Sequence, residues 1–307
     1  MRLASVSVDL DEIPNYFDIH GLGPPKESVR GLVYELALDR LRGLAAAGRF
    51  PLTLFAIGSD LDRAHARDGL AIAVREGHEV ANHSLDHRYD LVRLGRAEIA
   101  RQVDEGAKAI EGATGERPVG FRAPGYTITD EVFEVLADLG VRYDASVFPC
   151  PPYWLVKAAK LGAIRVRGRE SRSILDTPRV LFAPTRPYRI GRPYWKRGNG
   201  LLEIPVQVTR GLRLPYIGTS VTMAGPSRAR LLTKMCIGEP LVNLELHGID
   251  VLDAEDGLED LSPHQVDVRV AQAKKTKAIL AACAELKSAG YTFVTMREAA
   301  AALGTLS

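Results

Sequence analysis

The chain has 307 residues, of which 46% are hydrophobic and 25% charged, a composition that is ordinary for a globular protein and argues against disorder. A formal net charge of +2 is too small to predict a nucleic-acid or membrane surface. The stretch 165–197 is locally rich in arginine, and we interpret it as a solvated loop. No apolar run is long enough to predict a helix across a bilayer.

The amino terminus passes from Met1-Arg2 straight into an apolar–polar pattern, without the hydrophobic region and cleavage site of an export signal. We therefore expect the mature chain to begin here and the protein to be cytoplasmic. Cys150, Cys236 and Cys283 are far apart and odd in number, which predicts reduced, partly buried thiols rather than metal ligands. No linker divides the chain, so we expect a single domain over residues 1–307.

Apolar periodicity predicts strands that alternate with helices along the chain. The predicted strands are residues 3–8, 52–57, 78–82, 119–122, 141–144, 241–246 and 291–295. The predicted helices are residues 28–47, 60–76, 96–113, 129–139, 227–235, 265–289 and 297–303. This order implies a parallel sheet wrapped by crossover helices, either closed as a barrel or open and doubly wound.

The segment from about residue 150 to residue 200 breaks this alternation. It is rich in proline and arginine, and its only strand candidates are the short runs 163–166 and 180–183. We interpret the segment as an insertion, after which regular structure resumes at residues 200–209.

Polar residues stand where the predicted strands end, which is where parallel α/β folds collect their functional groups. The candidates are Asp9, Asp11, His83, His87, Arg122, Asp144 and His247. Asp9 and Asp11 are two residues apart on a strand and so share a face. The His83–His87 pair has the spacing of two imidazoles that reach one zinc-like ion, and a carboxylate would complete the ligand set. One aspartate could bind the ion while the other remains free as a base for hydrolysis.

Five ordered motifs carry a resemblance to a known family. They are Ser-Val-Asp-Leu-Asp at 7–11, Asn-His-Ser-Leu-Asp-His at 82–87, Phe-Arg-Ala-Pro-Gly-Tyr at 121–126, Arg-Tyr-Asp-Ala-Ser-Val-Phe-Pro at 142–149 and Leu-Glu-Leu-His at 244–247. In these motifs the chain resembles the polysaccharide deacetylases of carbohydrate esterase family 4, also called the NodB-homology domain. The resemblance runs in family order from residue 3 to about residue 300, interrupted by the insertion.

The resemblance implies an α/β fold, a distorted (β/α) barrel with about seven parallel strands, and a divalent metal that is usually zinc. The metal would be held by Asp11, His83 and His87. Asp9 would be the general base that takes a proton from the attacking water, and Arg122 would orient Asp9.

The resemblance also implies the groups that act on the leaving side of the bond. His247 would be the general acid toward the leaving amine, and Asp144 would pair with His247 or with Arg122. A backbone N–H at Gly125 or Tyr126 would help to hold the oxyanion. The bond cut would be an amide, most often the N-acetyl of an amino sugar.

Departures from the family pattern bear on the substrate. Leu10 separates the two aspartates that are usually adjacent, Gly125 replaces the usual aromatic, and no tryptophan follows Asp144 at the familiar spacing. These changes alter the walls of the site more than its chemistry. Without an export signal, a small, lipid-linked or nucleotide-linked amino sugar fits better than intact cell-wall polymer.

Two other functions fit the same residues. One is a related C–N hydrolase, such as a deformylase or cyclic-amide hydrolase, with the same metal centre. The other is a non-catalytic carbohydrate-binding relative. The base Asp9, its orienting Arg122 and the acid His247 argue against a pure binder. The sequence predicts no nucleic-acid partner, and it does not predict the oligomeric state.

Overall fold

The sheet is built around its first strand, β1 (Leu3–Asp9), in a computed structural model that describes residues 2–304. The expected starting residue Met1 and the last three residues of the expected domain lie outside this range. β1 pairs in parallel with β2 (Leu52–Ala56) and β8 (Leu241–His247), and its first residues also pair with β9 (Thr292–Phe293). All seven residues of β1 are buried, as a strand covered on both faces requires.

The sheet runs in the order β6-β7-β5-β4-β3-β2-β1-β8, with β9 beside β1. The seven strands from β7 to β8 are parallel, and β6 pairs with β7 in the antiparallel direction. The remaining strands are β3 (Glu79–Asn82), β4 (Gly120–Phe121), β5 (Tyr143–Asp144), β6 (Tyr188–Ile190) and β7 (Arg197–Glu203). The predicted α/β fold with about seven parallel strands is confirmed.

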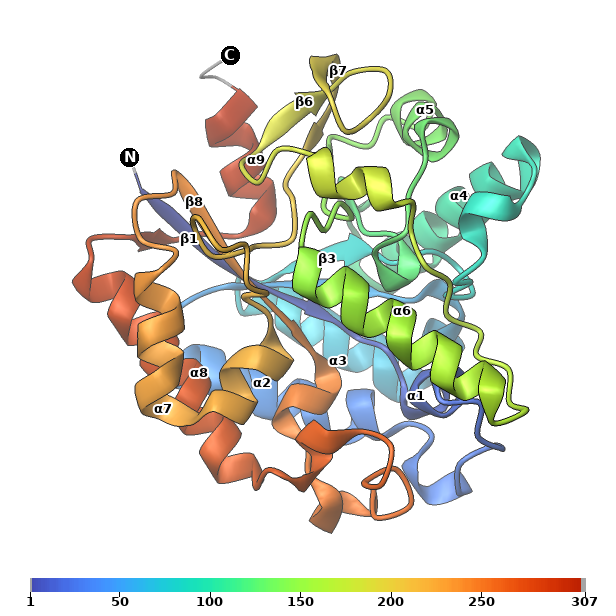
Figure 1. Cartoon of the computed structure of the whole chain (residues 1–307), viewed down its shortest axis with the longest axis vertical. Helices are drawn as coiled ribbons and strands as arrows, with labels where there is room; N and C mark the ends of the chain where they lie inside the picture. The colour runs from blue at the N-terminus through green and yellow to red at the C-terminus, as the bar shows by residue number, and fades with distance from the viewer. Residues whose placement is uncertain (1, 305–307) are drawn as a thin grey trace.

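Helices surround the sheet (Figure 1). They are α1 (Ile13–Ile19), α2 (Leu38–Gly48), α3 (Ala64–Arg75), α4 (Arg96–Thr114), α5 (Asp130–Asp138), α6 (Pro151–Val166), α7 (Gly218–Lys234), α8 (Gln272–Ser288) and α9 (Met296–Gly304). A π-helical turn, Val33–Ala37, leads into α2. Within residues 2–304, no helix has both the length and the hydrophobicity needed to cross a membrane.

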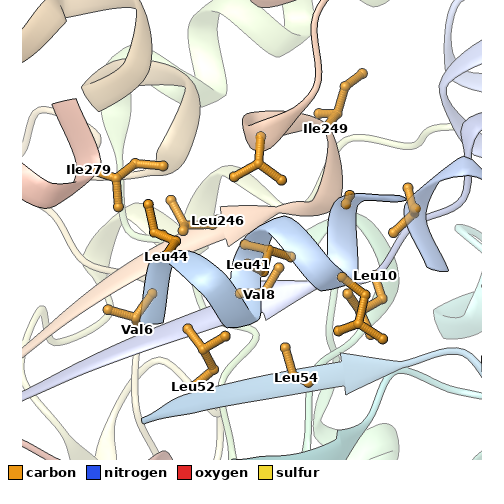
Figure 2. Close-up of a cluster of buried hydrophobic side chains, with 14 of the residues drawn as sticks. Val6, Val8, Leu10, Leu41, Leu44, Leu52, Leu54, Leu246, Ile249 and Ile279 are labelled. Carbon is orange, nitrogen blue, oxygen red and sulfur yellow. The ribbon is translucent and has the colours of Figure 1, made fainter. Parts of the chain in front are cut away.

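The outer face of the central strands is apolar. Val6 and Val8 of β1 pack under Leu41 and Leu44 of α2, and Leu246 of β8 joins the same cluster (Figure 2). Each of these side chains is almost fully buried, and burial of this kind contributes about 1.5–3 kcal/mol per side chain. Side chains alternate along a strand, so the residues between them point to the inner face.

The inner face of the same strands is polar. On β1 it carries Ser7 and Asp9, and on β8 it carries Asn243, Glu245 and His247, all in register. Asn243 Nδ2 donates to Ser7 Oγ at 3.0 Å. The polar face therefore ends in Asp9 and His247 at the carboxyl edge of the sheet, where the candidate residues gather.

The segment 150–200 differs from its prediction. Residues 163–166 end α6 instead of forming a strand, because Pro151 and Pro152 start a 16-residue helix with apolar residues at helical spacing. Residues 180–183 lie mostly in the 3-10 turn Pro178–Phe182, which is capped by the Thr177 side chain. The segment also contains β6 and the first residues of β7, which pair with each other in the antiparallel direction.

Two helices also differ from their predictions. α7 begins at Gly218 rather than at residue 227, and it is kinked at Gly225, where φ is +74° before Pro226. α1 is seven residues long and was not predicted. Its shortness leaves too few turns for a periodic apolar pattern to be visible.

Candidate metal and catalytic site

The strand register brings the candidate residues to one edge of the sheet. Asp9 is the register partner of His247, and Asn82, just before His83, is the partner of Phe121, just before Arg122. Strands β1 and β4 are separated by two others and would lie about 14 Å apart in a flat sheet. Arg122 nevertheless contacts Asp9 directly, so the sheet is curled and its inner edge forms the site.

The loop after β3 presents the two histidines. The Asn82 side chain accepts a hydrogen bond from the Ser84 N–H at 2.9 Å, and Ser84 Oγ accepts one from the His87 N–H at 3.1 Å. Ser84 and His87 adopt positive φ values of 70° and 49°, which are uncommon for residues with a side chain. The loop is therefore a tight, partly strained turn, and His87 is held one turn beyond His83 without a helix.

Helix α4 supports this loop from outside. Asn82 Nδ2 donates to the Val103 carbonyl and the Leu85 N–H donates to the Gln102 carbonyl, both at 2.8 Å. A side chain at Gly106 would come within 2.8 Å of the Asn82 side chain and 2.9 Å of the Ser84 backbone. Only glycine allows α4 to approach the loop so closely.

Asp11 lies between the two imidazoles. Its Oδ1 is 3.3 Å from His83 Nε2 and 3.2 Å from His87 Nε2. Ligands bound about 2.0–2.2 Å from a zinc ion at tetrahedral angles lie about 3.3–3.6 Å apart, so these separations suit one ion. Asp11 Oδ1 and His87 Nε2 are buried without a hydrogen-bond partner among the described residues. The nitrogen and oxygen atoms therefore fit a divalent cation.

The other ring nitrogens of the histidines are already engaged. His83 Nδ1 lies 2.7 Å from the Arg122 carbonyl, and His87 Nδ1 lies 3.1 Å from Asn15 Oδ1. Contacts of this kind fix the ring orientation and leave Nε2 available as the ligand atom.

Asn15 was not identified from the sequence, because it lies on the unpredicted helix α1. Glu12 fixes the start of that helix: its carboxylate accepts hydrogen bonds from the N–H groups of Ile13, Val33 and Tyr34. An asparagine four residues after Asp11 is the only signal that could have indicated it.

The two histidines control the charge of Asp11. Burial alone would raise the pKa of its carboxyl group, but His87 and His83 hold that pKa well below its usual range. Asp11 is therefore ionised, as a metal ligand must be.

Asp9 is held by a buried arginine. Arg122 Nη1 donates to Asp9 Oδ1 at 2.5 Å, Nη2 donates to Ser7 Oγ at 2.9 Å, and Nε donates to the Ala145 carbonyl at 3.0 Å. The guanidinium also lies 4.1 Å from the centre of the Phe55 ring. These contacts fix Asp9 Oδ1 and leave Oδ2 on the side of His83 Nε2, 3.8 Å away.

His247 is paired with a carboxylate on its own strand. Its Nδ1 lies 3.0 Å from Glu245 Oε1, and its Nε2 lies 3.4 Å from the Tyr126 hydroxyl and 4.0 Å from Asp11 Oδ2. Burial would lower the pKa of His247, but Glu245 raises it well above its usual value. His247 is therefore held in its protonated form, and its Nε2 faces the candidate metal ligands.

The predicted pairing of Asp144 differs from the contacts in the structure. Asp144 accepts hydrogen bonds from the N–H and the hydroxyl of Ser146, not from Arg122 or His247. Ser146 Oγ in turn accepts from the Ala123 N–H at 2.8 Å, so Asp144 supports the turn that follows Arg122. The residue that contacts His247 is Glu245, which the sequence interpretation missed although it is the one acidic residue of β8 and lies two residues before His247.

A second buried carboxyl group lies beside Asp144. Glu203 is its register partner on β7, and neither side chain is exposed. Burial raises the pKa of both groups, and the charge of Asp144 raises that of Glu203 well above its usual range. Glu203 therefore retains its proton more readily than Asp144. Its protonation avoids two negative charges side by side in the buried interior.

The turn at Gly125 and Tyr126 forms one wall of the site. Both residues have positive φ, 64° and 57°. The Tyr126 N–H donates to the Ala123 carbonyl at 3.1 Å, so this group is already used within the turn. Tyr126 instead directs its hydroxyl at His247.

Comparison with known families gives one match. Residues 38–143 match the model of the family described as polysaccharide deacetylase. The matched region contains His83, His87 and Arg122, while both candidate aspartates of the first strand and His247 lie outside it.

Two curated relatives share part of the chain. A chitooligosaccharide deacetylase of Sinorhizobium fredii is 39% identical over 31% of this chain and 44% of its own length. A peptidoglycan deacetylase of Helicobacter pylori is 26% identical over 47% of this chain and 49% of its own length. The chain thus spans slightly less than half the length of the curated relatives it matches.

Solved structures share the fold over nearly the whole chain. A Mycobacterium smegmatis protein assigned to the polysaccharide deacetylases superposes with a TM-score of 0.62 and 17% identity, covering 99% of this chain and 90% of the other. A pseudoenzyme of carbohydrate esterase family 4 from Bacillus anthracis gives a TM-score of 0.50 and 13% identity, over 97% of this chain and 64% of the other. At these identities the likeness concerns the fold alone.

Proposed function

Because residues 38–143 match the model of the polysaccharide deacetylase family, we propose that the chain is a metal-dependent hydrolase that removes the N-acetyl group from an amino sugar or glycan-type substrate. The observation that carries the proposal is the group of Asp11, His83 and His87. Their facing atoms are spaced for one cation, and two of these atoms are buried without a hydrogen-bond partner among the described residues.

A divalent cation at this position, zinc by its nitrogen and oxygen donors, would polarise the amide carbonyl and lower the pKa of a water molecule. Asp9 takes the proton from the attacking water on Oδ2, since Oδ1 is occupied by Arg122. Arg122 orients Asp9, because its guanidinium is buried with Asp9 as its carboxylate partner.

His247 completes the reaction on the opposite side of the scissile bond. Its Nε2 gives a proton to the amine nitrogen as the C–N bond breaks, so that acetate and a free amine leave. Glu245 on Nδ1 keeps the imidazole protonated for this step. The N–H at Gly125 is proposed as an oxyanion donor, whereas the Tyr126 N–H is already bonded to Ala123.

The substrate class follows from the relatives. The curated proteins that the chain resembles are named for chitooligosaccharides and peptidoglycan, both of which carry N-acetylated amino sugars. An N-acetylated amino sugar therefore presents the amide that this site would cut. The fold does not guarantee turnover, since the Bacillus anthracis structure that shares it is called a pseudoenzyme.

The proposal is tested by measuring acetate released from N-acetylglucosamine oligomers before and after treatment with a chelator. We expect release that the chelator abolishes and added zinc restores. Formate from N-formylated sugars, without acetate from the acetylated ones, would assign the site to a deformylase. Zinc binding without release of either acid would leave a carbohydrate-binding protein and overturn the proposal.

A further inference from the structure

Helix α6 exposes its apolar face. Leu155 and Val156 are 62% and 66% exposed, and Val166 is 89% exposed. Leu155, Ala159, Ala163 and Val166 follow one another at intervals of four, four and three residues, so they form one stripe along the helix. Ala159 and Ala163 are exposed as well. In a water-soluble helix this stripe would face the core.

The opposite face of α6 is already used. Tyr153 packs on Tyr126 and Phe148, with ring centres 6.1 and 4.5 Å apart, and Lys157 Nζ donates to the Gly125 carbonyl at 2.9 Å. Ile164, further along the same face, is buried. α6 therefore packs on the protein through one face and exposes a second, apolar face to solvent.

Basic residues accompany the stripe. Residues 151–175 contain six basic side chains and one acidic side chain, Glu170. Arg165 and Arg167 are exposed and, within residues 2–304, have no carboxylate at ion-pair distance. The expectation of a solvated loop over 165–197 is wrong at its start, because Arg165 lies in the last turn of α6 and Arg167 caps this helix. An apolar stripe with unpaired cations at its edge is the pattern of a helix that lies in the surface of an anionic bilayer.

We propose that α6 docks the protein on an anionic lipid surface, with Leu155, Val156 and Val166 inserted among the lipids and Arg165 and Arg167 at the headgroups. At 16 residues α6 is too short to cross a bilayer, so it would lie in the plane of the interface. A second copy of the chain explains the stripe less well, because the exposed arginines need an anionic partner surface.

Docking would set the orientation of the candidate site. α6 begins beside Tyr126, whose hydroxyl faces His247, and the segment after α6 is tied to α1, where Ser171 Oγ donates to the Ile19 carbonyl at 2.8 Å. The helix thus runs along the rim between two elements that carry site residues (Figure 1). This step rests on the proposed function: an amino sugar linked to a lipid would be presented to the site by the same membrane.

The test is co-sedimentation of the full chain with lipid vesicles. We expect binding to vesicles of phosphatidylcholine and phosphatidylglycerol in equal parts, weakened by added salt, and little binding to phosphatidylcholine alone. The double variant L155D/V166D should bind at least about tenfold more weakly. R165Q/R167Q should lose about fivefold for each arginine removed.

Leu231→Asp is the matched control, because Leu231 is 60% exposed on α7 and lies outside the stripe. It should bind vesicles like the wild type. All variants should release acetate from a short soluble N-acetylated oligomer at the wild-type rate. Acetate release thus tests the proposed function, and vesicle binding tests the docking proposal independently of it. Vesicle binding that L155D/V166D leaves unchanged, or no binding to either vesicle, would overturn the proposal. A dimer in sedimentation velocity that L155D/V166D dissociates, without vesicle binding, would assign the stripe to a second copy of this chain.

Discussion

Asp9 and Asp11 are two residues apart, on one face of the chain, yet they meet different partners. Asp9 contacts the guanidinium of Arg122, and Asp11 contacts the imidazoles of His83 and His87. A carboxylate bound to a fixed arginine can still accept a proton, while one placed between two imidazoles is suited to bind a cation. The contacts thus support the assignment of base to Asp9 and ligand to Asp11.

This division predicts different behaviour for two substitutions. Asp9→Asn should retain bound zinc but lose activity by about 10²–10⁴-fold, because only the proton acceptor is removed. His83→Ala should lose both, because it removes a ligand atom. Metal content after gel filtration and the rate of acetate release measure the two effects. Equal metal content in both variants would contradict the assignment.

The strand-end argument made Asp11, His83 and His87 candidates, because strand ends of parallel sheets meet at one edge. The choice of Asp11 over Asp9 as the ligand came only from the family resemblance. The sequence interpretation missed Glu245 and Asn15, each of which supports a histidine. Such supporting contacts depend on where a side chain points, and a motif that lists only reactive groups does not record them. The family resemblance implied that Asp144 pairs with His247 or Arg122. In the structure it is Glu245 that contacts His247.

Glu245 should set the upper limit of the pH range for activity. His247 acts in its protonated form, and the charge of Glu245 holds its pKa well above the usual value, so activity falls only when the pH rises through that raised pKa. Glu245→Gln removes the charge and lowers the pKa. The high-pH limb of the pH–rate profile should therefore move to lower pH by about one unit or more.

Asp144→Asn is the control for this shift, because Asp144 is buried near the site but hydrogen-bonds to Ser146. It should leave the position of the high-pH limb largely unchanged, whatever its effect on the rate. A limb that stays in place in Glu245→Gln, or that moves equally in both variants, would argue against Glu245 as the partner of His247.

At the scale of elements, the contact between α4 and the histidine loop depends on one glycine. A methyl group at Gly106 would meet Asn82 Oδ1 at 2.8 Å and the Ser84 backbone at 2.9 Å. Gly106→Ala should lower the free energy of unfolding by about 1–3 kcal/mol. Gly112→Ala, on the same helix with nothing within 4 Å, should raise it by about 0.5–1 kcal/mol. Urea unfolding measures both, and a stabilising Gly106→Ala would show that the loop does not need the close approach.

Long periodic elements were predictable and short ones were not. The predicted strands 3–8, 52–57 and 241–246 and the predicted helices 96–113 and 265–289 combine length with a clear apolar period. All five are present in the fold, although the last helix begins seven residues later than predicted, at Gln272. The prediction of a strand over 163–166 is wrong, because four residues are too few to distinguish the two-residue period of a strand from the 3.6-residue period of a helix. Only the helix as a whole, which starts at Pro151, reveals the 3.6-residue repeat.

At the scale of the whole molecule, curling of the sheet is what assembles the site. The family resemblance implied a barrel, and the parallel strands run from β7 to β8. The polar faces of β1 and β8 end at the site. Arg122, just after β4, contacts Asp9 and Ser7 of β1 directly, which is possible only across that curled interior. The candidate base Asp9, Arg122 and three candidate ligands are thus collected from three segments that together span more than a hundred residues of the chain.

A crystal structure of the protein grown with zinc, with the ion located by its anomalous scattering, tests this arrangement most directly. The described residues contain two groups whose atoms could hold a cation: Asp11 with His83 and His87, and Asp9 with Glu245 and His247. We predict one ion about 2.0–2.2 Å from Asp11 Oδ1, His83 Nε2 and His87 Nε2. An ion bound by Asp9, Glu245 and His247 instead, or none at either position, would contradict the account.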